Sequence, residues 1–356
     1  MINVTKTYLP DFEKYQNYLK SIWENGWITN NGELVRELEQ KLADYFQSKH
    51  CVLVSNGTIA LQLALKLYNI KGEVITTPYS YVATTNAILW ENTTPVFADI
   101  NPKTGCLDAS KIEELITENT QAIMPVHVYG LPCEIEKIEE IAQKHNLKVI
   151  YDAAHAFGVT YKNKPVVNYG NLSTLSFHAT KLFHTVEGGA IITNNDEDAK
   201  QLKLLRAFGH INDDYYGLGI NAKMSELHAA MGLTILDDMP KIIEARKKDY
   251  HLYKKHLNGL TIQFFEIPEN TKYNYSYFPV LFENEQTVLK IKEALYKEGV
   301  NARRYFYPSL NTLPQVEYQS CPISEDIAKR VLCLPHFYGN NERIITKITN
   351  IIKALL

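Results

Sequence analysis

The feature that most constrains the fold of this chain is a regular alternation, between residues 32 and 195, of short apolar runs and helical segments. The helical segments, such as 32–46, 58–68 and 133–146, repeat their apolar residues at helical spacing. The runs are bounded by turn residues and span 51–56, 73–78, 95–100, 122–130, 148–153, 172–178 and 188–195. Apolar strands alternating with amphipathic helices are typical of a parallel sheet covered on both faces. The sequence therefore predicts an α/β fold with a mainly parallel sheet of these seven strands.

The pattern changes after Asn221. Residues 223–257 have the spacing of a long helix, and Pro240 predicts a break within it because proline disfavours a helix interior. Strand-like runs and further helical segments then alternate, with strands expected at 261–267, 275–283 and 300–306 and helices at 286–299 and 341–356. We therefore expect a large domain, 1–238, and a smaller α+β domain, 239–356.

Composition and charge exclude several classes of function. A net charge of -3 over 356 residues gives no reason to expect nucleic acid or an anionic membrane as a partner. The five cysteines are scattered without CxxC spacing, which favours neither a disulfide framework nor a zinc site. No signal peptide is recognisable at the N-terminus, and no apolar run approaches the ~20 residues needed to span a bilayer. We expect a cytoplasmic protein.

The segment Ser55–Thr58 lies between an apolar run and a helical segment. Gly57 allows close backbone approach, and the first N–H groups of a helix are free donors at its positive end, so Gly57 and Thr58 can hold a phosphate. The alternative is an ordinary strand-to-helix turn with Thr58 near the cap.

Asp152 ends the apolar run 148–152, at the edge where open α/β sheets bind ligands. A buried carboxylate needs a cationic or hydrogen-bonding partner, and a protonated pyridine nitrogen would serve. The alternative is an aspartate that caps the next turn. His155 follows and could donate to a phenolic oxygen, or could simply be packed.

Lys181 follows another apolar run and has apolar neighbours such as Phe177 and Phe183. Desolvation lowers the pKa of an ammonium in such surroundings and makes the amine a nucleophile toward an aldehyde. Ser176 and Thr180 add hydroxyl donors suited to a phosphate. A surface lysine is the alternative. A metal enzyme would have to use His127, His155, His178, His184 and His210, but their spacing matches no metal motif, and we expect no metal.

Eight motifs together carry a family resemblance that runs nearly end to end. They are NGWITNNG (25–32), SNGTIALQLAL (55–65), TPYSYVATTNAI (77–88), PVFADI (95–100), PVHVYG (125–130), YDAAHAFG (151–158), SFHATKLFHTVEGGA (176–190) and GINAKMSELHAAMG (219–232). In these the chain resembles the DegT/DnrJ/EryC1/StrS family of sugar aminotransferases, which depend on pyridoxal 5'-phosphate (PLP). The resemblance implies the aspartate-aminotransferase fold (PLP fold type I).

The resemblance also implies the roles of individual residues. Lys181 would form a Schiff base with PLP and move protons, and Asp152 would pair with the pyridinium nitrogen. Further contacts to the cofactor would come from Gly57, Thr58 and Ser176 at the phosphate, Tyr81 on the ring face, His155 at the ring hydroxyl and Asn221 at the phosphate of the other subunit. Many members carry Gln at the position of His155 and Arg at that of Lys223. A homodimer with shared active sites is therefore expected.

The expected substrates are L-glutamate and a nucleotide-linked keto-sugar. SFHATK, PVHVYG and RRYFYPSLN are most similar to enzymes that convert dTDP-4-keto-6-deoxy-D-glucose to dTDP-4-amino-4,6-dideoxy-D-glucose, for O-antigen or other glycans. A 3-keto-sugar or a GDP- or UDP-sugar is the alternative. The candidates for the diphosphate are Arg303 and Arg304, with Tyr305 or Tyr307 nearby, although paired arginines also occur on solvated edge strands. Two alternatives are a sugar dehydratase and a cofactor-binding regulator. The related dehydratases carry histidine in place of the lysine, so Lys181 argues against the first. Cofactor binding alone would not need Lys181 together with Asp152, which argues against the second.

Overall fold

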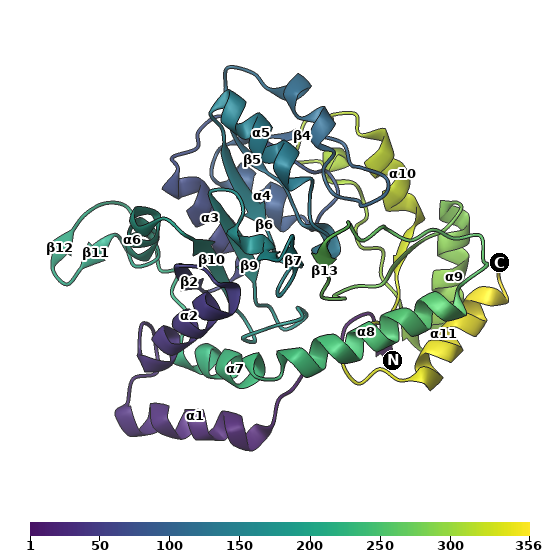
Figure 1. The fold of residues 1–356 in the computed structure, drawn as a ribbon, viewed down its shortest axis with the longest axis horizontal. Helices are drawn as coiled ribbons and strands as arrows, with labels where there is room; N and C mark the ends of the chain where they lie inside the picture. Colours follow the sequence, from purple (N-terminus) through teal and green to yellow (C-terminus); the bar gives the residue numbers. More distant parts are fainter.

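Seven strands form the central sheet of the computed structural model, which describes residues 1–356 (Figure 1). They are β2 (His50–Val54), β3 (Glu73–Thr76), β4 (Thr94–Phe97), β5 (Thr120–Met124), β6 (Lys148–Asp152), β9 (Leu172–Ser176) and β10 (Gly189–Thr193). The order across the sheet is β2-β10-β9-β6-β5-β3-β4, and only β10 runs antiparallel to its neighbours. Each predicted run overlaps one of these strands, so the predicted mainly parallel sheet is confirmed.

Helices cover both faces of this sheet because its strands are apolar on both sides. Val52 and Val54 point to one face, in a core with residues of α3, α4 and α6, whereas Cys51 and Leu53 point to the other, in a core with α2 and α7. The helices of this part are α1 (Phe12–Asn25), α2 (Glu33–Phe46), α3 (Gly57–Leu67), α4 (Ala83–Trp90), α5 (Ile135–His145), α6 (Asp196–Leu205) and α7 (Glu226–Leu236).

The C-terminal part begins with α8 (Met239–His256), a long helix that leads away from the sheet (Figure 1). Pro240 lies in its first turn, where proline costs no helical hydrogen bond, so the helix breaks where the sequence predicts. The other elements are α9 (Glu285–Lys297), α10 (Pro322–Arg330), α11 (Glu342–Lys353), the antiparallel pair β14 (Pro279–Leu281) and β16 (Val331–Cys333), and β15 (Val300–Asn301). The N-terminal strand β1 (Ile2–Asn3) pairs with β15 and so joins this part. The domain boundary at 238/239 stays a prediction.

The strand expected at 261–267 does not form. Its only sheet-like contact is an isolated bridge between Gln263 and Leu281, and the aromatic side chain of Phe265 is buried among Tyr79 and Tyr129 instead. Apolar residues therefore enter the core here without a hydrogen-bonded ladder. The strands expected at 275–283 and 300–306 shrink to β14 and β15.

The remaining elements are short. Three small strands form one sheet: β7 (Thr160–Tyr161), β8 (Lys164–Pro165) and β13 (Thr271–Lys272). Two others form a hairpin: β11 (His210–Ile211) and β12 (Asp214–Tyr215). Single 3-10 turns lie at η1 (Ala109–Lys111), η2 (Glu113–Leu115), η3 (Val128–Gly130), η4 (Val166–Asn168) and η5 (Leu310–Thr312). The β11–β12 hairpin projects from the body of the molecule (Figure 1).

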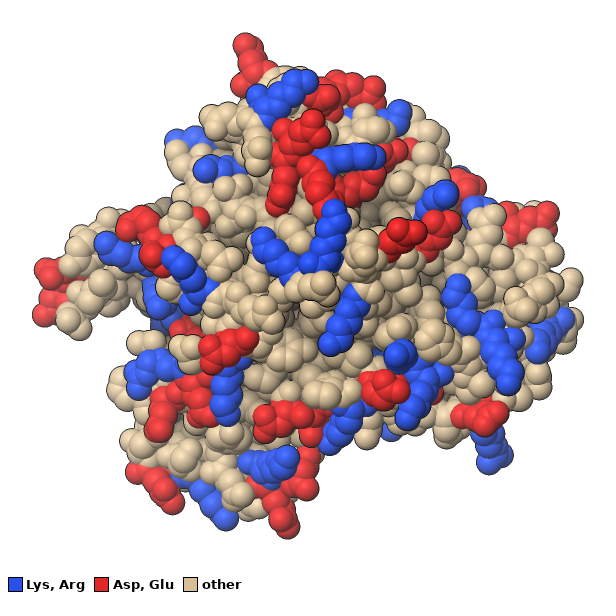
Figure 2. All heavy atoms as spheres, viewed as in Figure 1, with Lys and Arg blue, Asp and Glu red and all other residues tan.

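Acidic and basic side chains are interspersed over the face drawn in Figure 2, so this face carries no broad region of one charge. None of the helices combines the length and the apolar character needed to cross a membrane.

Candidate active site

A cavity of about 730 Å³ opens at the carboxyl edge of the sheet. One side, here called the sheet wall, consists of the carboxyl ends of β6 and β9, the loops that follow them and the first turns of α3 and α4. It includes Gly57, Asp152, His155, Ser176 and Lys181. The opposite side, here called the C-terminal wall, consists of Tyr277, Arg303, Tyr305, Phe306 and, from the N-terminal segment, Thr5. The residues of the sheet wall lie together because parallel strands end at the same edge of the sheet.

Asp152 and Lys181 face the same cavity. Asp152 is 5% exposed, its Oδ2 accepts from Thr84 Oγ1 at 2.7 Å, and its Oδ1 accepts from the Ala154 N–H at 3.0 Å. Burial raises the pKa of Asp152, while these two hydrogen bonds and the nearby Lys181 charge oppose the rise. Desolvation lowers the pKa of Lys181 to about 8, although the Asp152 carboxylate favours its charged form. The pair therefore offers a carboxylate and an amine that is readily deprotonated near neutral pH.

His155 is held in one orientation by two contacts. Its Nδ1 accepts the backbone N–H of Tyr129 at 3.2 Å, and its ring stacks on Phe306 with centroids 5.6 Å apart. Burial, aided by the Lys181 charge, lowers the pKa of His155 well below its usual value, so the ring is neutral at pH 7. With Nδ1 used as an acceptor, Nε2 carries the proton and is a donor.

The start of α3 presents unpaired donors. Asn56, not Thr58, caps the helix by accepting the Ile59 N–H at 2.9 Å, and the N–H groups of Gly57 and Thr58 have no partner in the chain. A Cβ at position 57 would lie 2.7 Å from the Cβ of Ser176, so glycine is needed for this approach of α3 to β9. The Ser176 hydroxyl lines the same cavity. Donors at a helix N-terminus suit an anion such as phosphate.

Thr84 is a cavity residue that the sequence interpretation missed. It is buried in the first turn of α4, and its hydroxyl donates to Asp152 while Ser80 Oγ lies 3.2 Å away. The only available signal was a pair of adjacent threonines, Thr84 and Thr85, which is uninformative until the fold brings α4 beside β6. Tyr81, which was predicted, also lines the cavity and is 59% exposed.

Asn221 and Lys223 do not line this cavity. Asn221 is exposed at the base of the β11–β12 hairpin, and the carbonyl of the following residue, Ala222, accepts the Ser55 N–H at 2.8 Å. The Lys223 ammonium lies over the ring of Phe208, 4.4 Å from its centroid. All the residues predicted to contact the cofactor, except Asn221, thus line one cavity of a single chain.

The four predicted substrate residues divide into two pairs. Arg303 and Tyr305 line the cavity, whereas Arg304 and Tyr307 do not. The Arg304 guanidinium donates to Glu285 at 2.6 Å and packs on the Tyr307 ring, 3.4 Å from its centroid. Arg304 is therefore engaged in the C-terminal part, and only Arg303 of the two arginines faces the cavity.

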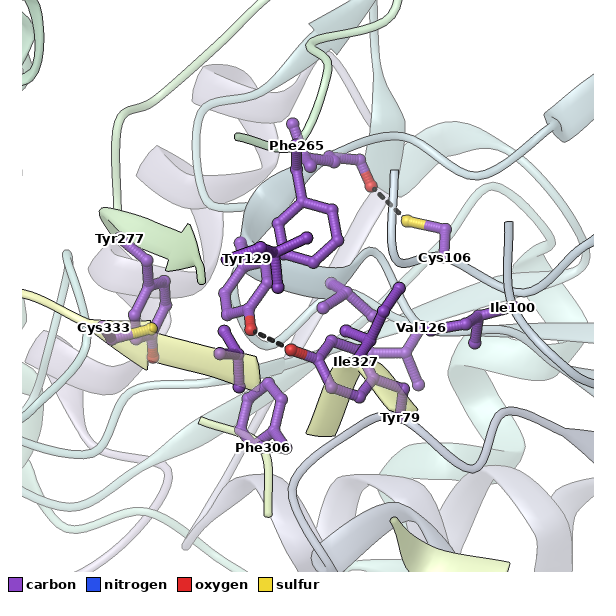
Figure 3. Close-up of a cluster of buried hydrophobic side chains, with 14 of the residues drawn as sticks. Tyr79, Ile100, Cys106, Val126, Tyr129, Phe265, Tyr277, Phe306, Ile327 and Cys333 are labelled. Carbon is purple, nitrogen blue, oxygen red and sulfur yellow. Dashed lines mark hydrogen bonds between the residues drawn. The ribbon is translucent and has the colours of Figure 1, made fainter. Parts of the chain in front are cut away.

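An aromatic cluster supports the C-terminal wall from behind (Figure 3). The hydroxyls of Tyr79 and Tyr129 lie 2.7 Å apart, and Tyr129 also donates to the carbonyl of Tyr305. The Tyr129 ring stacks on Phe306 with centroids 5.7 Å apart. These contacts fix the backbone of the segment that carries Arg303 against the sheet.

The histidines considered for a metal do not form a ligand group in the structure. His127 is buried and stacked on Tyr151, with its pKa lowered to about 3 by burial, whereas His178 and His210 are outside the core. No group of three or more His, Cys, Asp or Glu side chains is arranged to hold a metal ion.

Comparison with solved structures defines the class of protein. A crystal structure of DesI in the presence of its TDP-sugar product matches with a TM-score of 0.94 and 33% identity, covering 99% of this chain and 92% of that chain. The dTDP-4-amino-4,6-dideoxy-D-glucose transaminase of Shigella dysenteriae is 42% identical, covering 99% of each chain. The GDP-perosamine synthase of Escherichia coli O157:H7 is 33% identical, covering 95% of this chain and 96% of that protein. The fold is that of PLP-dependent sugar aminotransferases.

The family follows from the sequence as a whole. The model of the DegT/DnrJ/EryC1/StrS aminotransferase family matches residues 11–353. The chain belongs to this family, as its motifs predicted, and this membership makes it an aminotransferase.

Proposed function

We propose that this protein transfers the amino group of L-glutamate to dTDP-4-keto-6-deoxy-D-glucose, giving dTDP-4-amino-4,6-dideoxy-D-glucose, with PLP as its cofactor. The observation that carries the proposal is the placement of Lys181 and Asp152 in one cavity, with the pKa of Lys181 lowered to about 8. The choice of sugar is supported by the 42% identity to the Shigella dysenteriae transaminase over 99% of each chain.

The residues of the sheet wall fit PLP group by group. The free N–H groups of Gly57 and Thr58 and the Ser176 hydroxyl suit the dianionic phosphate, and the glycine is required by the 2.7 Å approach to Ser176. The buried Asp152 carboxylate suits a protonated ring nitrogen. The Nε2–H of His155 suits the ring hydroxyl oxygen, and exposed Tyr81 can cover the ring face.

When bound, PLP supplies an aldehyde that links to amines and a protonated ring that withdraws electrons from the linked carbon. Lys181 Nζ would hold the cofactor covalently and, once displaced by the amino donor, would take up and return the migrating proton. A pKa of about 8 suits both tasks because the amine can hold or release a proton near neutral pH. Asp152, as the carboxylate, would keep the ring nitrogen protonated. Thr84 orients Asp152 through the 2.7 Å hydrogen bond to its Oδ2.

We also propose a homodimer in which Asn221 completes the phosphate site of the partner subunit. Two observations support this: Asn221 does not line its own cavity, and the adjoining hairpin exposes several apolar side chains. They are Phe208, Ile211, Tyr215, Tyr216, Leu218 and Ile220, each more than 40% exposed. An exposed apolar surface of this kind favours burial against another molecule. In a two-fold symmetric dimer, each subunit presents the same surface to its partner, so both surfaces can be buried.

The first experiment tests the cofactor and Lys181. The protein is incubated with PLP, reduced with borohydride, digested and mapped by mass spectrometry. We expect the adduct on Lys181, and Lys164→Ala, a change at an exposed lysine outside the cavity, should label normally. An adduct on another lysine, or none, would contradict the assignment.

The second experiment tests the substrate. Purified protein with PLP and L-glutamate is given dTDP-4-keto-6-deoxy-D-glucose, the GDP-linked 4-keto sugar and UDP-linked 3-keto sugars in parallel, and the products are identified by mass and NMR. We expect the dTDP-4-amino sugar as the main product. Preferred conversion of a GDP- or UDP-sugar would replace the substrate assignment while leaving amino transfer intact.

A further inference from the structure

The N-terminal segment, residues 2–8, crosses from the C-terminal part to the large sheet beside the cavity. Its first anchor is the parallel pairing of β1 with β15, in which Ile2 aligns with Val300 and Asn3 with Asn301. The carbonyl of Val4 then accepts the His336 N–H at 3.1 Å. The beginning of the segment is thus fixed to the elements that lead into Arg303.

The second anchor is Tyr8. Its hydroxyl donates to Asp238 Oδ2 at 2.6 Å, and Asp238 also pairs with Lys241 at 2.7 Å. His184 Nδ1 accepts the Val186 N–H, so His184 Nε2 carries the proton and donates to the Tyr8 carbonyl at 2.7 Å. The end of the segment is thus fixed to the junction of α7 and α8 and to the loop that carries Lys181.

Thr5 lies between the two anchors and is the only residue of the segment that lines the cavity. Its hydroxyl makes no hydrogen bond within the chain. The β1–β15 pairing places the start of the segment beside the strand that leads to Arg303, and Arg303 lines the same wall of the cavity. The Arg303 guanidinium lies over the Tyr305 ring, 5.6 Å from its centroid, and makes no ion pair or hydrogen bond within the chain. The neighbouring Arg304, by contrast, is bonded to Glu285. A hydroxyl and a guanidinium, neither of them hydrogen-bonded within the chain, therefore both line the C-terminal wall.

We propose that Thr5 and Arg303 together bind an oxyanion of the substrate, either the diphosphate of the nucleotide sugar or the side-chain carboxylate of L-glutamate. A guanidinium binds phosphate or carboxylate through paired N–H donors, and a hydroxyl adds a further donor to the same anion. The two anchors hold Thr5 in place before the substrate arrives, which reduces the ordering that binding requires. This inference rests on the proposed function, because it assigns a substrate group to that cavity.

The test compares Thr5→Val, which is nearly isosteric but lacks the hydroxyl, with Thr5→Ser, which keeps it. Thr7→Val is the matched control, since Thr7 lies in the same segment but not on the cavity. Binding of dTDP to the PLP-loaded protein is measured by titration calorimetry. The two half-reactions, with L-glutamate and with the keto-sugar, are followed separately by the absorbance of the bound cofactor.

We expect Thr5→Val to weaken binding by about tenfold, as for the loss of a hydrogen bond to a charged group, while Thr5→Ser and Thr7→Val stay near wild type. A weaker dTDP titration and a raised KM for the keto-sugar alone assign the diphosphate. A raised KM for L-glutamate alone assigns the carboxylate. The Thr5→Val/Arg303→Ala double variant should be only slightly weaker than Arg303→Ala, because both residues hold one anion.

Two results would overturn the inference: unchanged binding and KM in Thr5→Val for both substrates, or fully multiplicative effects in the double variant. A wild-type protein that aminates no keto-sugar while still taking up PLP on Lys181 would instead refute the proposed function. The two failures are therefore distinguishable.

Discussion

The two walls of the cavity are built in different ways. In the sheet wall, Asp152 and Ser176 are the last residues of two neighbouring strands, and Lys181 lies in the loop that follows the second. The register fixes the positions of the strand ends; Asp152, for example, aligns with Thr174 of β9. The C-terminal wall joins Thr5, Tyr277 and Arg303, which come from opposite ends of the chain and lie in short strands or loops. We therefore expect the sheet wall to position the reacting groups and the C-terminal wall to select the substrate. Variants on either wall can test that division.

Removal of Lys181 should have the largest effect. Lys181→Ala loses both the covalent attachment and the proton carrier, and we expect turnover to fall by at least about 10³-fold, within the range seen for general acid–base groups. The fold should persist because the side chain lies at the cavity and not in the core. Single-turnover kinetics with L-glutamate measure the loss. Near-normal turnover would show that Lys181 is not a reacting group of the sheet wall.

Mixed dimers test whether the sheet wall is complete in one chain. Lys181→Ala and Asn221→Asp proteins are each expected to be inactive or impaired, and they are dissociated, mixed and reassociated. If the sites are shared, a heterodimer has one intact site, and random pairing should restore about a quarter of wild-type activity. Heterodimer formation is confirmed with two different affinity tags. No recovered activity in confirmed heterodimers would place Asn221 and Lys181 in the same site.

Asp152→Asn should reduce turnover by more than about tenfold while leaving PLP bound. The amide is nearly isosteric with the carboxylate, and Thr84 can still donate to its oxygen. The neutral amide cannot stabilise the protonated ring nitrogen of PLP, however, and lowering the pKa of that nitrogen by one unit corresponds to ~1.4 kcal/mol. Turnover is measured beside cofactor content, with thermal unfolding as the control for folding. Normal turnover at full cofactor content would show that Asp152 is structural.

On the C-terminal wall, the two adjacent arginines should behave differently. Arg303→Ala is expected to raise KM for the substrate whose oxyanion it binds by about tenfold, with kcat largely kept, since it removes a charge-assisted hydrogen bond. Arg304→Ala should leave KM unchanged and lower the free energy of unfolding by about 1 kcal/mol, because it loses the ion pair with Glu285. Urea unfolding measures the second effect. The reverse pattern would exchange the roles of the two residues.

The smallest expected effect is a shift in pH dependence. Because desolvation lowers the pKa of Lys181 to about 8, its reaction with PLP in the apoprotein should speed up as pH rises toward 8 and then level off. The Asp152 carboxylate raises this pKa, so Asp152→Asn should move the midpoint to lower pH. Stopped-flow absorbance measures both profiles. A midpoint near the ordinary lysine value would contradict the desolvated setting of Lys181.

The sequence predicted the sheet wall better than the C-terminal wall, for a physical reason. Apolar runs with Asp152 and Ser176 at or near their ends predict buried strands. Because parallel strands end at one edge of the sheet, those residues could be grouped from the sequence alone. The orientation of Arg304 depends on its ion pair with Glu285. Glu285 lies in another element, and no local sequence pattern predicts that the two residues are close. Thr5 and Thr84 carry no chemical signal of their own and acquire a place only when distant segments meet. The family resemblance added roles but not these contacts.

The antiparallel strand β10 has a consequence for the order in which the site is assembled during folding. Gly189 pairs with Ser176, and inside that pair the Phe177 N–H donates to Gly188 while the Thr185 N–H donates to Phe177. The loop that carries Lys181 is therefore closed by a short hairpin-like connection, whose closure costs little chain entropy. Thr5 and Arg303 meet only after nearly the whole chain has been synthesised and brought together. Local contacts of the first kind form quickly and distant ones slowly, so the lysine loop can be ordered before the opposite wall exists.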